Sequence, residues 1–435
     1  MAVMKSSTSA PRAGRGSSVT VAVSLGELTP GVRLRTPIYE NRLDRDLLLL
    51  AAGTVVTDKA LENLRSRGVT HVRVDPSEIT RLTGQAASSA RPCEIEKQRT
   101  TATRFALSPE SLLHKVSRHR ATRYDAERMS AFSNAYESAV ATISTLSGNL
   151  ASGSLQDAPE LASVSADSIV RITQDLDLFV ALGVKPENAG LPEKHSTQVA
   201  MLAMSVGTLF GLRPSDLIEL GVGCLIHDTG MMLLREDVRQ TNRRLSNLEF
   251  LEVTKHPAIT YDLLSRLRDV PTGSRMVAYQ MHERCDGSGY PRGRSAAQIH
   301  PLAKIAAVAD VYVALVSDRP WRPGLLPYKA MEQIIRDTRD GLFDPDVIRA
   351  LLKTVSLFPI GSGVETSDGR VGTVVRTNRE LFTRPVVELW RPGEPMSPEV
   401  VDLSQNHAVS ITRAIKDARA IIARPGAVSL EDFWE

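Results

Sequence analysis

The sequence predicts a multidomain protein in which an all-α domain is flanked by a small N-terminal α+β module and a small C-terminal β module. Strand-like alternation and one buried apolar run occur near the N-terminus. From residue 108 to 354 apolar residues recur at helical spacing, and 192–354 contains no convincing strand. Alternating valines return around Ser367-Asp368-Gly369, which is typical of a hairpin turn. The 435 residues leave room for two or three domains of ~100–200 residues each.

Composition excludes several classes of protein. The chain has 53 basic and 50 acidic residues, a net charge of +3 and only 5% aromatic residues, so a DNA or RNA partner is not expected. The three cysteines are widely spaced and form no disulfide framework, which favours a reducing cytoplasm. The longest apolar run, 47–56, is about half the length of a membrane span, and the N-terminus lacks the apolar core of a secretory signal. We therefore expect a cytoplasmic protein without a transmembrane segment.

The N-terminal quarter of the chain divides into three parts. Residues 1–18 are mostly Ser, Gly, Ala, Arg and Pro, and we expect a disordered tail. Residues 19–76 form the α+β module, and 77–106 read as a linker because they lack a sustained period. In the module, a helix begins at Thr57-Asp58, whose side chains are good caps. Its strands are expected at 32–39, 47–56 and 69–75.

The remainder of the chain is helical until the C-terminal module. We expect a helical connector at 107–184, a larger helical domain at 185–354, a β module at 355–412 and a C-terminal tail at 413–435. Amphipathic helices in front of such a domain often form a homodimer, and equally often they pack on the domain itself. The two flanking modules offer surfaces for signalling protein partners.

Imidazoles and carboxylates recur on the apolar helices of the large domain. Each has an ordinary structural explanation when taken alone, since a buried histidine is more often a hydrogen-bonded core residue than a ligand. An ionised carboxylate within a long apolar helix, however, costs several kcal/mol unless it is compensated. Six such side chains fall in this one domain: His195, His227, Asp228, His256, His282 and Asp310.

Mixed His/Asp ligation suits borderline divalent metals such as Fe, Mn, Ni, Co or Zn. Two such ions ~3.5–4 Å apart, sharing a carboxylate, are a standard arrangement for hydrolysing phosphoesters. The residues themselves therefore indicate a helical, metal-dependent phosphohydrolase.

The order and spacing of these motifs resemble the HD-GYP family over about 185–354. The resemblance is carried by His227-Asp228-x-Gly230 and by the long sequence HERCDGSGYP, which spans His282 to Pro291. It implies an all-α, HD-type catalytic domain that hydrolyses cyclic di-GMP to pGpG or GMP. It also implies one or two divalent ions, with Fe or Mn ahead of Zn, Ni and Co.

The resemblance also implies roles for individual residues. The first metal would be held by His195, His227, Asp228 and Asp310. The second would be held by the bridging Asp228 with His256 and His282, which makes Asp228 and His282 the central catalytic residues. The substrate would be bound by Gly289, Tyr290, Pro291, Arg319 and Arg322.

Four positions depart from the family pattern. Met281 stands where a metal-binding histidine is usual, and a thioether is a poor ligand for hard or borderline ions. Met231 stands where a lysine is usual, and losing one donor to a developing charge typically costs ~10²–10³ in rate. Val313 replaces a polar residue, and Leu191 replaces the glutamate that would hold a third metal. Two functions therefore stay open: a cyclic di-GMP phosphodiesterase of reduced activity, and an inactive relative that binds cyclic di-GMP or a protein partner.

Overall fold

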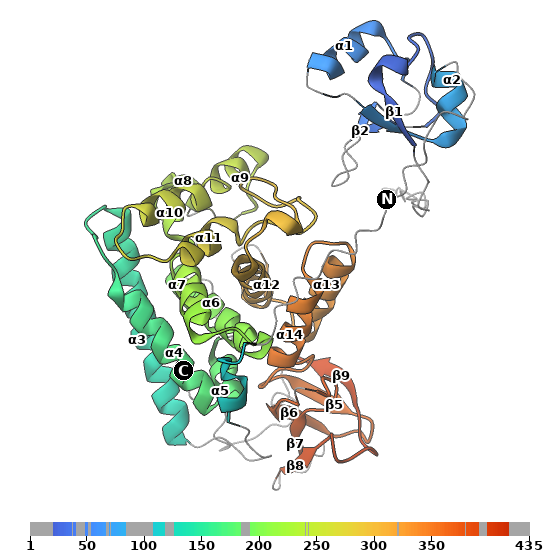
Figure 1. The fold of residues 1–435 in the computed structure, drawn as a ribbon. Coiled ribbons are helices and arrows are strands. Elements are labelled where there is room, and N and C mark those ends of the chain that lie inside the picture. Colours follow the sequence, from blue (N-terminus) through green and yellow to red (C-terminus); the bar gives the residue numbers. More distant parts are fainter. Residues whose placement is uncertain are drawn as a thin grey trace, which may run out of the picture. The chain divides into compact units, whose positions relative to one another are not determined.

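The computed structural model divides the chain into two compact units, Met1–Arg99 and Thr100–Glu435 (Figure 1). The expected tail at 1–18, most of the linker at 77–106, Leu191 and the end of the tail at 413–435 lie outside the described residues. The structure describes residues 21–36, 38–40, 48–50, 54–66, 69, 71–83, 108–117, 126–183, 192–239, 241, 243–319, 322–378, 380–390 and 398–416.

The N-terminal unit is built on a four-stranded antiparallel sheet in the order β1-β4-β2-β3. Its strands are β1 Val21–Ser24, β2 Ile38–Glu40, β3 Leu48–Leu50 and β4 His71–Val74, and its helical elements are η1 Leu25–Glu27, α1 Asp58–Ser66, η2 Pro76–Glu78 and α2 Ile79–Thr83. The expected strand at 32–39 is wrong over most of its length, because before Ile38 it makes a single bridge, from Arg33 to Val55.

The N-terminal unit continues past residue 76, where the sequence predicted that a linker begins. In α2, Ile79 and Leu82 are buried and belong to the same apolar core as Val72 and Leu61. The hydrophobic side chains of this short helix close one side of the small core, so the expected boundary falls too early.

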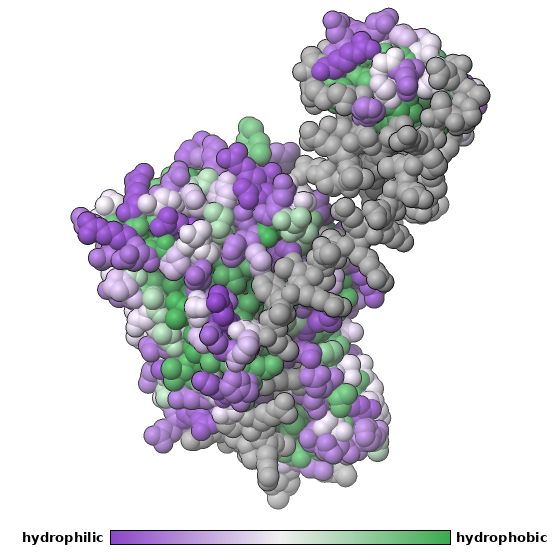
Figure 2. Space-filling model, viewed as in Figure 1, coloured by the Kyte–Doolittle hydropathy of each residue, from purple (hydrophilic) through white to green (hydrophobic). Residues whose placement is uncertain are grey.

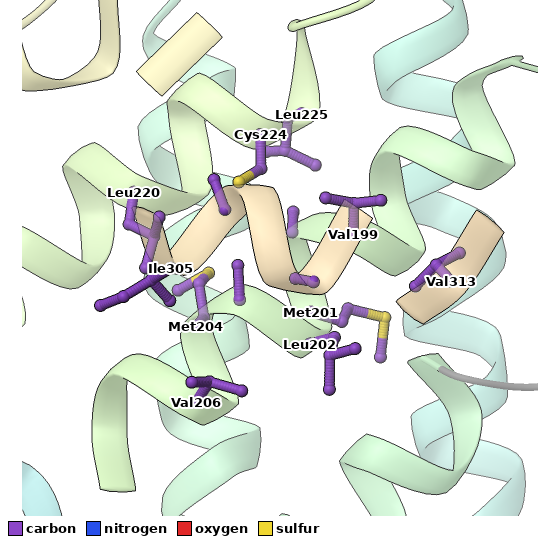
Figure 3. Packing of buried hydrophobic residues seen from close by; sticks show 14 of the residues in the cluster. Val199, Met201, Leu202, Met204, Val206, Leu220, Cys224, Leu225, Ile305 and Val313 are labelled. Atoms are coloured by element: carbon purple, nitrogen blue, oxygen red, sulfur yellow. The ribbon is translucent and has the colours of Figure 1, made fainter. Parts of the chain in front are cut away.

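The second unit holds the connector helices and the large domain around one apolar core. Its described helices are α3 Ala126–Ala151, α4 Pro159–Gln174, α5 Leu176–Gly183, α6 Pro192–Phe210, α7 Pro214–Leu225, α8 Glu236–Arg239, α9 Asn247–Val253, α10 His256–Ser265, α11 Thr272–Gln280, α12 Pro301–Val316, α13 Pro327–Arg339 and α14 Pro345–Val355. Short 3-10 helices are η4 Leu112–Lys115, η5 Thr229–Leu233 and η6 Ala296–Gln298. Figure 3 shows the centre of the core, where Leu202 on α6, Cys224 on α7 and Ile305 on α12 belong to one buried cluster.

The connector helices are part of this core. Ile143 of α3, Leu161 and Ile172 of α4 and Phe179 of α5 are buried in the same cluster as the side chains of α6. The connector is therefore packed against the large domain along its length, and this packing fixes the helix that carries His195.

The C-terminal module is a five-stranded antiparallel sheet in the order β8-β7-β6-β5-β9. The strands are β5 Gly363–Thr366, β6 Val371–Arg376, β7 Val386–Trp390, β8 Glu399–Asp402 and β9 Ile411–Ile415. The predicted hairpin is confirmed, and Gly369 supplies its turn with a φ of +80°. The expected end at 412 falls inside β9, since Gly363 pairs with Ile415.

A buried ion pair joins the sheet to the helical domain. Arg376 Nη1 of β6 lies 3.2 Å from both carboxylate oxygens of Asp175, and both side chains are buried. Asp175 also accepts a hydrogen bond from the backbone N–H of Leu178, at the start of α5. The β module is therefore anchored at a helix start 201 residues earlier in the chain.

Among the described residues we find no helix with the length and hydrophobicity that crossing a bilayer requires.

Candidate metal centre

The ends of two helices supply three of the candidate ligands. His195 lies in the first turn of α6, which begins at Pro192. The apolar helix α7 ends at Leu225, and His227 and Asp228 follow in the turn that enters η5. Because they leave the helix, these two side chains can approach the same point, which adjacent residues within a helix cannot.

The remaining ligands come from three further elements. Ser246 and Glu249 form a capping box at the start of α9, which ends at Val253. His256 is the first residue of the next helix, α10. His282 lies two residues beyond the end of α11, and Asp310 lies inside α12.

The structure brings all six side chains together. His195 Nε2 lies 3.0 Å from Asp310 Oδ1, and His282 Nδ1 lies 3.5 Å from the other oxygen of Asp310. His227 Nε2 and His256 Nε2 lie 3.3 and 3.4 Å from the two oxygens of Asp228. The rings of His256 and His282 are 4.8 Å apart at their centroids.

The donor atoms form two groups with one member in common. One group is His195, His227 and Asp228, and the other is Asp228, His256 and His282, each with ligand atoms within 4.8 Å of one another. Nε2 of His227, His256 and His282 is buried and has no hydrogen-bond partner among the described residues. Since an unsatisfied buried polar atom costs about 1–3 kcal/mol, three at one point are best explained as ligands for cations. The residues present therefore fit a divalent metal at each group.

The short distances between these imidazoles and carboxylates determine their protonation. Burial opposes the ionisation of Asp310, yet the hydrogen bonds from His195 and His282 hold its pKa well below the usual range. Burial would also lower the pKa of His227, but the carboxylates of Asp228 and Asp310 raise it to about 9. Both carboxylates are therefore ionised and available as ligands at neutral pH.

Backbone carbonyls fix the orientation of two of the rings. His227 donates from Nδ1 to the carbonyl of Cys224 at 2.7 Å, and His256 donates from Nδ1 to that of Val253 at 2.8 Å. Because Nδ1 is the donor to the carbonyl, Nε2 of each ring faces the site, and at Nε2 of His227 a bound cation would take the place of the second proton. Burial and the neighbouring His282 lower the pKa of His256 to about 4, so this ring is neutral at pH 7.

Thr260 ties the turn of His227 and Asp228 to α10. Its buried hydroxyl donates to the carbonyl of His227 at 2.9 Å and accepts from the N–H of Gly230 at 2.9 Å. A Cβ on Gly230 would lie 2.4 Å from the carbonyl oxygen of His256, so the turn and the start of α10 touch closely. Sequence reasoning missed Thr260, and no local pattern marks a threonine that acts across 30 residues.

The Gly-Tyr-Pro loop closes over one side of the site. The ring of Tyr290 stacks on that of His282 with a centroid distance of 5.0 Å and an interplanar angle of 15°. A Cβ on Gly289 would lie 2.4 Å from the backbone N of Arg284, so only glycine fits there. The buried carboxylate of Glu283 accepts hydrogen bonds from the N–H groups of residues 292 and 294, which fixes the loop beyond Pro291.

The two arginines that were expected to bind the substrate differ in how their side chains are held. Arg322 donates to the carbonyls of Ala314 at 2.6 Å and Leu315 at 3.3 Å, so its guanidinium caps the end of α12. A phosphate contact from Arg322 would require these bonds to be exchanged. Arg319 pairs with Arg322 through the backbone, which leaves its half-buried side chain as the better candidate of the two.

The residues that depart from the family pattern are buried to different degrees. Met281 and Val313 are fully buried and belong to the apolar core. Met231 is half-buried in η5, three residues after Asp228.

The helical fold and the clustered His and Asp side chains are typical of a helical domain that binds metal ions, and comparison with known families agrees. Residues 187–347 match the family described as "HD domain". The expected resemblance is confirmed over this segment, which is similar to HD domains, and the relatives described below are named as cyclic dinucleotide phosphodiesterases.

Three relatives illustrate the similarity. A cyclic di-GMP phosphodiesterase of Pseudomonas aeruginosa is 32% identical over 57% of this chain and 59% of its own length. A cyclic di-GMP phosphodiesterase response regulator of Xanthomonas campestris is 33% identical over 36% of this chain and 41% of its own length. A 3′3′-cGAMP-specific phosphodiesterase of Vibrio cholerae is 30% identical over 38% and 35%. The chain thus spans about a third to three fifths of these relatives.

Among solved structures, an HD-GYP-type protein of Bdellovibrio bacteriovorus superposes with a TM-score of 0.41 and 16% identity, over 76% of this chain and 98% of its own.

Proposed function

We propose that this protein is a metal-dependent phosphodiesterase that hydrolyses cyclic di-GMP to pGpG or GMP in bacterial signalling. The observation that carries the proposal is the pair of ligand groups that share Asp228, with three buried imidazole nitrogens left without partners. The relatives named above act on cyclic dinucleotides, which gives the substrate class.

Six residues would hold the metals. His195, His227, Asp228 and Asp310 form the first site, and Asp228, His256 and His282 form the second. Divalent ions at such a centre bind phosphate oxygens and lower the pKa of water, with Fe or Mn as the first candidates for these ligands. The protein's own contribution is to orient Nε2 of His227 and His256 through backbone carbonyls and to keep both carboxylates ionised.

The mouth of the site supplies contacts to the substrate. Gly289, Tyr290 and Pro291 would shape the entrance, and the stacked ring of Tyr290 screens His282 from one side. Arg319 would pair with a phosphate, because its planar guanidinium matches two phosphate oxygens.

A specific observation also favours a second candidate, an inactive relative that binds cyclic di-GMP or a protein partner. Met281 is fully buried, and its thioether is a poor ligand for hard or borderline ions, so the second site would have three protein ligands, one of them shared. With Met231 in place of a cation, a site that binds the dinucleotide without cleaving it is the natural alternative.

Metal content and turnover decide between the two. Protein purified without oxygen and loaded with Mn or Fe is tested on cyclic di-GMP and on 3′3′-cGAMP, with the products separated by chromatography. We expect two ions per chain and cleavage of cyclic di-GMP. Fewer than two ions and no turnover above buffer would refute the enzyme, and tight binding of intact cyclic di-GMP would support the second candidate.

Two variants control this test. Asp310→Ala should remove metal from the first site, and unchanged metal content would refute the assignment of ligands. Asp262→Ala removes an exposed carboxylate from α10, the helix that begins with His256, and should leave metal content and turnover unchanged.

A further inference from the structure

A separate pocket lies between the connector helices α3 and α4, with α6 as its floor. Its volume is about 300 Å³, at the lower end of the ~300–1,000 Å³ typical of small-molecule sites. Small side chains leave this space open, among them Ala135 and Ala139 on α3 and Ser163 and Ser168 on α4. None of its lining residues belongs to the two groups of metal ligands.

The inner surface of the pocket is apolar and aromatic. Phe132 and Tyr136 line it from α3, Phe179 from α5, and Met201 and Met204 from α6. Figure 3 shows both methionines on α6 among the buried core side chains, and Figure 2 shows apolar residues between polar ones on this side of the unit. Polarizable thioethers and aromatic rings accept a flat apolar molecule well.

One cationic side chain at this pocket lacks an acceptor. Arg171, in the last turn of α4, is half-buried, and its guanidinium carbon lies 5.4 Å from the centre of the Phe132 ring. Its Nε is shielded from water, and within the described part of the chain it has no hydrogen-bond partner. Nε itself is out of a ligand's reach, but the side chain as a whole is only half-buried, so its terminal N–H groups can donate to an acceptor that a ligand brings.

The acidic residues of the pocket do not fill this role. Glu160 and Asp167 also line it, but both are exposed on α4, and within the described part of the chain neither forms an ion pair with Arg171. Water screens the charges of these two carboxylates, so they repel an anion bound at Arg171 only weakly.

We propose that this pocket binds a compact aromatic carboxylate and that occupancy is transmitted to the metal centre. The carboxylate would accept hydrogen bonds from Arg171, and the ring would lie among the aromatic side chains and the methionines. Recognition of one planar anion by one half-buried guanidinium beside aromatic rings is a common form of small-molecule binding.

Two contacts connect the pocket to the candidate metal centre. Thr197, which lines the pocket, follows His195 by two residues on α6. In the other direction, α3 reaches the turn of Asp228, where Thr229 donates from its hydroxyl to that of Ser147 at 3.4 Å. A ligand that contacts both α3 and α6 therefore restrains α6, which carries His195, and, through α3, the turn that carries Asp228.

The test uses the full chain and two probes of equal shape, 2-naphthoate and the uncharged 2-naphthamide. Binding is followed by ligand-observed NMR and calorimetry. We expect 2-naphthoate to bind at least about tenfold more tightly than the amide, the factor expected for one charge-assisted hydrogen bond. We also expect hydrogen exchange to slow in α6 and in residues 227–233 when 2-naphthoate is bound, a readout that does not depend on metal or turnover.

Matched variants locate the site. Arg171→Met should weaken 2-naphthoate binding by about tenfold and leave the amide unchanged, whereas Arg266→Met, at an exposed arginine of the same unit, should change neither. Ala139→Leu should fill the pocket and abolish binding, whereas Ala141→Leu, on the exposed side of α3, should not.

Three results would overturn the proposal. They are no binding of 2-naphthoate up to millimolar concentrations, equal binding to the Arg171→Met variant, and unchanged binding to the Ala139→Leu variant. Binding at the pocket without slower exchange in α6 and 227–233 would overturn its connection to the metal centre.

Discussion

Thr260→Val should destabilise the protein and loosen the metal centre at the same time. The substitution keeps the shape of the side chain and removes a fully buried hydroxyl that bonds the carbonyl of His227 and the N–H of Gly230, each at 2.9 Å. Each of the two buried backbone groups left without a partner costs about 1–3 kcal/mol, so the free energy of unfolding should fall by about 2–6 kcal/mol. Groups that orient metal ligands typically contribute ~10–100-fold to metal affinity, and we expect a loss of that size.

Thr208→Val is the matched control for this measurement. Thr208 is also fully buried, but its hydroxyl donates only to the carbonyl of Met204, one turn earlier in α6, so its loss should cost less than about 1 kcal/mol. Unfolding by urea is followed by circular dichroism on metal-free protein, and metal affinity is measured by competition with a chelator. Equal destabilisation by the two variants, or an unchanged metal affinity in Thr260→Val, would refute the reasoning.

Three further predictions concern the loop, the β module and the altered site residues. Gly289→Ala places a Cβ 2.4 Å from backbone, so we expect turnover to fall while metal content stays at the wild-type level; wild-type turnover would contradict the loop's role. Arg376→Met removes the nearer of the two arginines that face the buried carboxylate of Asp175 and should cost about 3–5 kcal/mol in urea unfolding, and a loss below about 1 kcal/mol would argue against the anchor. Met281→His combined with Met231→Lys should raise turnover of cyclic di-GMP by about 10²–10³, and a double variant that binds two metals yet remains inert would place the defect elsewhere.

The sequence predicted the all-α domain and the flanking modules, and the six side chains that it named as candidate ligands lie together in the structure, five of them in the two ligand groups. The helices were predictable because their apolar residues repeat at 3.6-residue spacing, and the hairpin because Gly369 marks its turn. The ligands could be selected because an imidazole or carboxylate in an apolar stretch needs a partner.

Contacts between distant parts of the chain could not be predicted. The Asp175–Arg376 pair joins residues 201 positions apart, and Thr260 acts across 30 residues, so no local period records either of them. The N-terminal module was ended too early because α2 has only five residues, too few to establish a helical period. Arg322 was expected to contact substrate, but its guanidinium already bonds the carbonyl of Ala314. The spacing of a motif cannot reveal such a bond.

The most direct test of the account is the metal content of the wild-type protein beside Asp228→Ala, after anaerobic loading with Mn or Fe and removal of free metal. Asp228 belongs to both ligand groups, so the account predicts two ions per wild-type chain and none in the variant. A wild-type chain that binds no metal, or an Asp228→Ala variant that keeps both ions, would contradict it.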